Sequence, residues 1–142
     1  MTKFFFILEV FLKIFLAFFI GSLLGVEREL KKKEAGLQTY SLVCLGACLF
    51  SLVAFLLGEL KIIDPSLIIM AIAVGMGFIG GGAISRNQSQ IFGLTTAAGL
   101  WTVAAIGLAI GAGFYSLAFL ATIFVLLILA GLGFLEEKFF KK

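Results

Sequence analysis

The chain has 142 residues, of which 62% are hydrophobic and only 13% are charged. Soluble domains are about 45–50% apolar and about 25% charged, so this composition excludes an ordinary soluble domain and indicates a protein embedded in a lipid bilayer. The net charge of +3 comes from basic residues in short gaps between apolar runs, a pattern that sets membrane orientation and argues against a nucleic-acid interface.

Five apolar segments follow one another along the chain, at residues 4–26, 37–57, 65–84, 93–110 and 114–135. Each has the length of about 17–25 residues that a helix needs to cross a bilayer. A transmembrane barrel would instead show runs of about ten residues that alternate between apolar and polar. We therefore predict an all-α, polytopic bundle of five transmembrane helices, forming a single membrane domain over residues 1–142 without a soluble domain.

The basic residues are concentrated in alternate gaps. Arg28, Lys31, Lys32 and Lys33 follow the first segment, Arg86 follows the third, and Lys138, Lys141 and Lys142 form the tail, whereas the other gaps hold Lys3 and Lys61. Cytoplasmic loops of membrane proteins are rich in Lys and Arg. This asymmetry predicts an N-terminus outside and a C-terminus in the cytoplasm, in a multi-pass protein of the plasma membrane.

Small residues recur at every fourth position of the first segment, at Ala17, Gly21 and Gly25. Residues at this spacing share one face of a helix, and small residues there let two helix backbones approach closely. We therefore predict that this face packs against a neighbouring helix. If the helix continues past Val26, the same face leads directly into a charged triplet.

The triplet Glu27, Arg28 and Glu29 has two interpretations that the sequence leaves open. It can be the solvated end of the first helix. It can also be a charge cluster held partly inside the bundle, where ionisable groups are costly and usually pair or line a polar pathway. Glu9 and Lys13, four residues apart with the acid first, form a second predicted ion pair, with Lys13 able to extend to the outer interface.

The third segment ends in a run of glycines. Gly75, Gly77 and Gly80 formally fit the dinucleotide pattern G-x-G-x-x-G, but that motif begins a helix after a strand, and here the glycines end a membrane helix. For Gly80, Gly81 and Gly82, two interpretations remain. They allow close helix packing, or they mark an unwound segment whose carbonyls line a polar cavity.

The fourth segment carries Thr95, Thr96 and Thr102, which we take as candidates for a polar pathway together with the glycine run. Threonine hydroxyls in helices also often bond to the preceding turn of their own helix. Gly99 and Trp101 are predicted packing residues. Because Trp101 lies near the middle of the segment and not at an interface, we expect it inside the bundle, with its indole N–H on an acceptor.

The sequence holds no set of residues typical of catalysis or metal binding. It has no histidine, and its two cysteines, Cys44 and Cys48, lie four residues apart in an apolar run. A zinc site would need more ligands, so we interpret both as small packing residues. No nucleophile elbow, phosphate-binding loop or carboxylate cluster is present. We predict neither an enzyme nor a cofactor.

Five blocks of sequence, taken in order, resemble the MgtC/SapB family of bacterial inner-membrane proteins. They are Gly25–Glu29, Ala35–Thr39, Leu42–Ala47, Gly77–Gly82 and Gly93–Trp101, within a similarity that extends over about residues 17–130. The resemblance implies a five-helix membrane domain associated with magnesium homeostasis, membrane energetics and, in some pathogens, survival inside host cells. It does not imply a proven transporter.

The chain departs from the family at two positions and in its length. Phe92 and Gln38 stand where family members commonly have arginine, and many members carry a soluble C-terminal domain that is absent up to Lys142. We therefore expect a regulatory or accessory protein of ion homeostasis that contacts lipid and either another membrane protein or copies of itself. The alternative is a transporter or channel subunit for Mg²⁺ or another small solute, although few acids lie at membrane depth to hold Mg²⁺.

Overall fold

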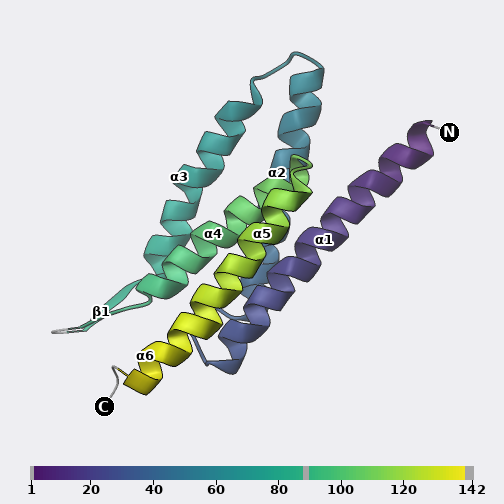
Figure 1. Ribbon diagram of the computed structural model, residues 1–142. Coiled ribbons are helices and arrows are strands. Elements are labelled where there is room, and N and C mark those ends of the chain that lie inside the picture. Colours follow the sequence, from purple (N-terminus) through teal and green to yellow (C-terminus); the bar gives the residue numbers. More distant parts are fainter. Residues whose placement is uncertain (1, 88–89, 140–142) are drawn as a thin grey trace.

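The structure, a computed structural model, describes residues 2–87 and 90–139. Two lysines of the predicted cytoplasmic tail, Lys141 and Lys142, lie outside the described residues. Figure 1 shows a bundle of long helices with one small hairpin. The elements are α1 (Thr2–Leu30), α2 (Leu37–Glu59), α3 (Pro65–Ala83), β1 (Ser85–Asn87), β2 (Gln90–Phe92), α4 (Leu94–Gly111), α5 (Tyr115–Leu126), the π-helix η1 (Leu127–Leu132) and α6 (Gly133–Phe139).

Five helical spans are long and apolar enough to cross a membrane. Four of them are α1 to α4, and the fifth is the rod that begins with α5 and continues through η1 to Leu135. The prediction of an all-α bundle of five membrane-spanning helices is therefore confirmed. The orientation of the termini relative to the cytoplasm remains a prediction.

Two features differ from the predicted elements. α1 continues as a helix to Leu30, so the charged triplet is helical and not part of a loop. The gap between the third and fourth spans forms an antiparallel hairpin, in which Ser85 pairs with Phe92 and Asn87 pairs with Gln90. The sequence did not indicate this hairpin because each strand has only three residues and both faces are exposed, so no alternation of apolar and polar residues marks it.

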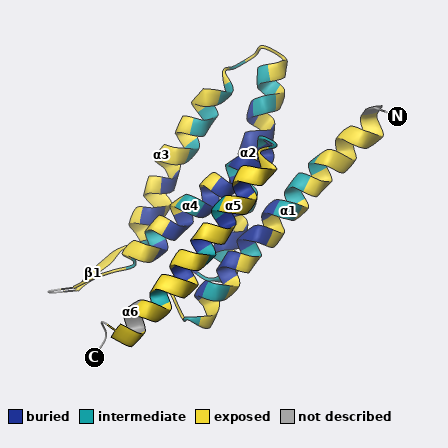
Figure 2. Cartoon of the chain, viewed as in Figure 1, coloured by how far each residue is buried: buried dark blue, intermediate teal, exposed yellow. Residues whose placement is uncertain are grey.

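The core lies between α2 and α4, with α1 packed on α2 and α3 packed on α4. Figure 2 shows buried residues concentrated where these helices meet and exposed residues along the outside of α1, α3 and α5. The largest fully buried side chains include Leu24, Tyr40, Leu100, Ile106 and Ile110. Many exposed residues are large and apolar, for example Phe18 and Phe78, as expected for a surface that contacts lipid.

Glycines allow the backbones of α1, α2 and α4 to approach closely. A Cβ atom added at Gly21 would lie 2.8 Å from the Cβ of Cys44, and one added at Gly25 would lie 2.7 Å from the Cα of Leu37. On the other side of α2, Gly107 lies against the backbone of Cys44. The hydrophobic effect contributes little to helix association within lipid, so such close van der Waals packing is a main source of stability for the helix bundle.

Three helices end in the same left-handed turn. Lys32 after α1 and Lys61 after α2 have φ values of 51° and 56°, and Gly113 after α4 has a φ of 86°. After α1, the Lys33 N–H donates to the carbonyl of Arg28 at 3.1 Å, which is the six-residue bond of a Schellman motif. This turn reverses the chain and directs residues 31–36 back over the end of the bundle.

Asp64 defines the start of α3. Its carboxylate accepts a hydrogen bond of 2.9 Å from the Ser66 backbone N–H, and Pro65 occupies the first helical turn, where its missing N–H costs nothing. The same bond holds the pKa of Asp64 below its usual value. The capped α3 then lies at the edge of the bundle, with Met76 and Gly80 as its buried residues.

Candidate functional site

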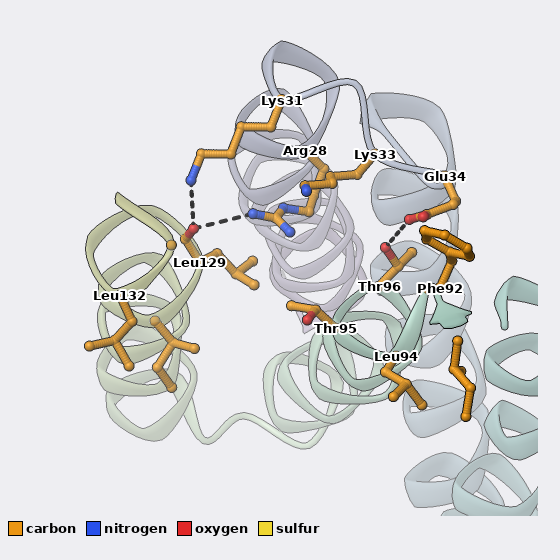
Figure 3. A pocket seen from close by; sticks show the side chains of 14 residues that line it. Arg28, Lys31, Lys33, Glu34, Phe92, Leu94, Thr95, Thr96, Leu129 and Leu132 are labelled. Atoms are coloured by element: carbon orange, nitrogen blue, oxygen red, sulfur yellow. Dashed lines mark hydrogen bonds between the residues drawn. The ribbon is translucent and has the colours of Figure 1, made fainter. Parts of the chain in front are cut away.

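A polar cavity of about 480 Å³ opens at the end of the bundle where α1, α4 and η1 meet. Figure 3 shows its side chains converging from these three elements and from the loop after α1. Its polar lining comes from Arg28, Lys31, Lys33, Glu34, Thr95 and Thr96. The apolar lining consists of Ile91, Phe92, Leu94, Ile128, Leu129 and Leu132, and the two glycines Gly93 and Gly133 complete the wall.

The buried face of α1 carries Arg28 into this cavity. Ile20, Leu24 and Arg28 follow one another at intervals of four, so they share a face of the helix, and all three are buried. Arg28 is only 2% exposed. Of the two interpretations of the charged triplet, the position of Arg28 matches the charge cluster held inside the bundle.

Arg28 and Lys31 join the end of α1 to the fifth span. The Nε of Arg28 donates to the Glu27 carboxylate, and its Nη2 donates to the backbone carbonyl of Leu129 at 3.3 Å. The Nζ of Lys31 donates to the same carbonyl at 2.8 Å and lies 2.9 Å from Oε1 of Glu27. One carboxylate and one carbonyl therefore hold both cations (Figure 3 shows the two bonds to Leu129).

The accepting carbonyl belongs to the π-helix η1. A π-helix replaces the usual i→i+4 hydrogen bonds by i→i+5 bonds, and such segments are frequent at functional sites. Leu129 is only 5% exposed, and its carbonyl accepts hydrogen bonds from two cationic side chains, Arg28 and Lys31.

Glu34 and Thr96 form the opposite wall of the cavity. Thr96 is only 1% exposed, and its hydroxyl donates to Oε2 of Glu34 at 2.6 Å. This hydrogen bond is the main reason why the pKa of Glu34 lies below its usual value, since it stabilises the ionised carboxylate. Glu34 is therefore a fixed negative charge facing three basic side chains.

The other predicted polar residues are not all brought together here. Glu29 turns away and accepts the Leu37 backbone N–H at 3.0 Å at the start of α2. Thr95 lines the cavity, but Thr102 donates to the carbonyl of Ala98 at 2.8 Å, within its own helix. The pathway that the sequence suggested from Thr95, Thr96 and Thr102 is thus divided between two locations.

The glycine run at the end of the third span is helical. Because α3 continues to Ala83, the interpretation of Gly80–Gly82 as an unwound segment is wrong. A Cβ at Gly80 would lie 3.6 Å from Ala97 in α4, whereas one at Gly81 or Gly82 would meet no atom of the described chain within 4 Å. Of the three, only Gly80 faces another helix.

The predicted packing residues of α4 differ in their positions. Gly99 is buried against the hydroxyl of Tyr40. Trp101 is 54% exposed, so the prediction that it packs inside the bundle is wrong. Its indole N–H donates instead to the carbonyl of Ala73 in the neighbouring helix α3, at 3.4 Å.

Sequence reasoning missed Lys31, Lys33, Glu34 and the Leu129 carbonyl as parts of the site. Lys31 lies four residues after Glu27, a spacing that predicts a pair once the helix is known to continue. Glu34 and Thr96 are 62 positions apart, so no local pattern connects them. A backbone carbonyl leaves no mark in a sequence at all.

Comparison with known proteins gives a consistent result. The profile of the MgtC family matches residues 14–138. Protein SapB of Bacillus subtilis is 38% identical over 126 residues, covering 84% of this chain and 54% of that protein. YhiD of Escherichia coli K12, named "Putative magnesium transporter YhiD", is 38% identical over 127 residues, covering 85% of this chain and 59% of that protein.

Protein MgtC of Brucella abortus is 39% identical over 110 residues, covering 78% of this chain and 45% of that protein. The chain thus spans about half the length of the curated relatives it matches. No solved structure matches the chain.

Proposed function

This chain is a member of the MgtC family and a multi-pass membrane protein, and from that premise we propose that it is an accessory protein of magnesium homeostasis. It acts through contacts of its membrane helices with another membrane protein or with copies of itself. We further propose that it lies in the bacterial plasma membrane with the basic end of the bundle in the cytoplasm. The link to magnesium rests on the name of a relative.

The charge of the polar cavity carries the proposal of an accessory role. Arg28, Lys31 and Lys33 line it against a single lining carboxylate, Glu34. Mg²⁺ is bound by oxygen ligands, usually carboxylates, and keeps several of its waters. A cavity dominated by fixed positive charge repels such an ion, which supports a role other than conduction of Mg²⁺ through this site.

A transporter is the second candidate, and the name of YhiD is the observation that favours it. Under that function, a pathway would pass the charged end of α1 and Thr96. The two candidates differ in one measurable property, since only a transporter moves Mg²⁺ across a bilayer without other proteins.

The deciding experiment combines growth with flux. A deletion strain is grown in low magnesium with and without this chain, and purified protein is tested for Mg²⁺ uptake in liposomes. We expect restored growth and no flux above empty liposomes. Robust flux from the purified protein would overturn the accessory role in favour of the transporter, and failure to restore growth would remove the link to magnesium.

A further inference from the structure

The cavity combines basic side chains with a buried guanidinium that has donors to spare. A guanidinium offers five N–H donors, and the bonds of Arg28 to Glu27 and Leu129 use two of them. Lys33 also lines the cavity, and no salt bridge joins it to a carboxylate in the described part of the chain. The lining therefore carries three cations and one anion, Glu34.

The cavity also has an apolar wall, formed by Ile91, Phe92, Leu94, Ile128 and Leu132. Ile91 and Phe92 of the hairpin are 56% and 45% exposed. Apolar and basic surfaces thus line one opening, and the close-up shows Leu132 and Phe92 on two of its sides with Lys31 along the edge between them (Figure 3). A ligand that fits both surfaces has an anionic group attached to an apolar body.

The position of the cavity along the bundle is compatible with a ligand that has an anionic head and an apolar body. α1 ends at Leu30 and α4 begins at Leu94, so the cavity lies where two membrane spans end. The first backbone N–H groups of α4 lie at the cavity end of the bundle, and Gly93 offers them no side-chain cap. A helix N-terminus with free N–H groups favours a negative charge nearby. Basic pockets between membrane helices at this level bind phosphate head groups.

We propose that this cavity binds a phosphate-bearing anion, with Arg28, Lys31 and Lys33 on the phosphate and the apolar wall against any attached acyl chain. The same chemistry is offered by the head group of an anionic phospholipid and by free phosphate. The proposal stands independently of the role in magnesium homeostasis, because it requires only the geometry of the cavity.

The test measures displacement of a fluorescent phosphatidylglycerol from the purified full chain in neutral detergent. The competitors are unlabelled dioleoylphosphatidylglycerol, dioleoylphosphatidylcholine, and inorganic phosphate at matched ionic strength. We expect phosphatidylglycerol to displace the probe at a concentration roughly tenfold lower than phosphatidylcholine, as three basic residues favour a net negative head group. The substitution Lys33→Gln should weaken binding about fivefold, the effect of one basic residue near an anionic lipid surface.

Lys32→Gln is the matched control, because Lys32 lies beside Lys33 in the same loop but does not line the cavity; its binding should stay within about twofold of the wild type. Displacement by inorganic phosphate alone would identify free phosphate as the ligand, and displacement by lipid alone would identify the head group. Equal displacement by both lipids with no effect of phosphate would overturn the proposal. So would equal losses in Lys32→Gln and Lys33→Gln, which would indicate diffuse attraction to the basic loop.

Discussion

Arg28 connects three parts of the chain through one guanidinium, since it contacts Glu27 in its own helix, the Leu129 carbonyl in η1 and the cavity between them. Its planar fork provides donors in fixed directions, which the single ammonium of lysine cannot reproduce. The residue is also almost fully buried. Its geometry therefore matters as well as its charge.

We predict that Arg28→Lys lowers the growth of the complemented deletion strain in low magnesium, even though the charge is kept. Protein levels in the membrane must be matched, because removing one partner of a buried ion pair costs about 3–5 kcal/mol of stability. Lys32→Gln serves as the control and should grow like the wild type. Full complementation by Arg28→Ala would contradict a functional role for this side chain.

The bond between Thr96 and Glu34 predicts a dependence on pH. The pKa of Glu34 is lowered in the folded protein from a reference value of 4.5. The ionised carboxylate therefore stabilises the folded protein fully above pH 4.5, and this stabilisation is lost as the pH falls through the folded pKa. We expect Thr96→Val to lower the melting temperature at pH 7, with a difference from the wild type that shrinks below about pH 4.5.

Thr102→Val is the matched control for this experiment, because Thr102 donates to a backbone carbonyl that does not titrate in this range. Its difference from the wild type should be the same at both pH values. A Thr96→Val difference that does not change with pH would show that the hydroxyl acts independently of the charge of Glu34.

Gly25 tests the close approach of α1 and α2. An added Cβ would lie 2.7 Å from the Cα of Leu37, and a backbone atom cannot move aside easily, so Gly25→Ala should destabilise the protein by about 1–3 kcal/mol. Gly75 in α3 has open space at the same position. There, Gly75→Ala should instead stabilise through helix propensity by up to about 1 kcal/mol, and equal melting temperatures in detergent would count against the packing argument.

Among the secondary-structure elements, α2 ends with a non-glycine residue in a left-handed turn. Lys61 has a φ of 56°, a conformation that costs roughly 1–2 kcal/mol for a residue with a side chain. Lys61→Gly should therefore raise the melting temperature in detergent. Lys61→Ala removes the same charge but keeps the Cβ, so it should give no such gain, and an equal rise in both variants would attribute the effect to charge.

The helical spans were predictable because each is a long apolar run, and crossing lipid requires such runs. The end of α1 was not, since its last turn carries charges that also suit a loop. The π-helix η1 and the hairpin after α3 lacked a local signal. At the site, Arg28 could be named as part of the charged triplet that ends the first helix, whereas its partner Leu129 lies 101 positions away and contributes only backbone.

For the whole molecule, five spans put the two termini on opposite sides of the membrane, and the basic residues predict the cytoplasmic side. A phosphatase that is active only outside the cytoplasm should be inactive when fused after Lys142, and a cytoplasmic fluorescent reporter should be active there. The same reporters fused before Met1 provide the reciprocal control. The opposite pair of activities would show that the basic end faces outward.

The unequal lengths of α1 and α4 have a consequence for how the bundle fits a bilayer. α1 has 29 residues and α4 has 18. At the usual helical rise these lengths are about 43 and 27 Å, compared with a hydrocarbon thickness of about 30 Å.

The excess length of α1 lies at its N-terminal end, because the helix from Arg28 back to Glu9 already measures about 28 Å. The Glu9–Lys13 ion pair, with its N–O distance of 2.8 Å, therefore falls close to the opposite boundary of the hydrocarbon, and the exposed turns before Glu9 extend into the head groups. A change in the tilt of α1 can then accommodate membranes of different thickness while the α2–α4 core stays as it is.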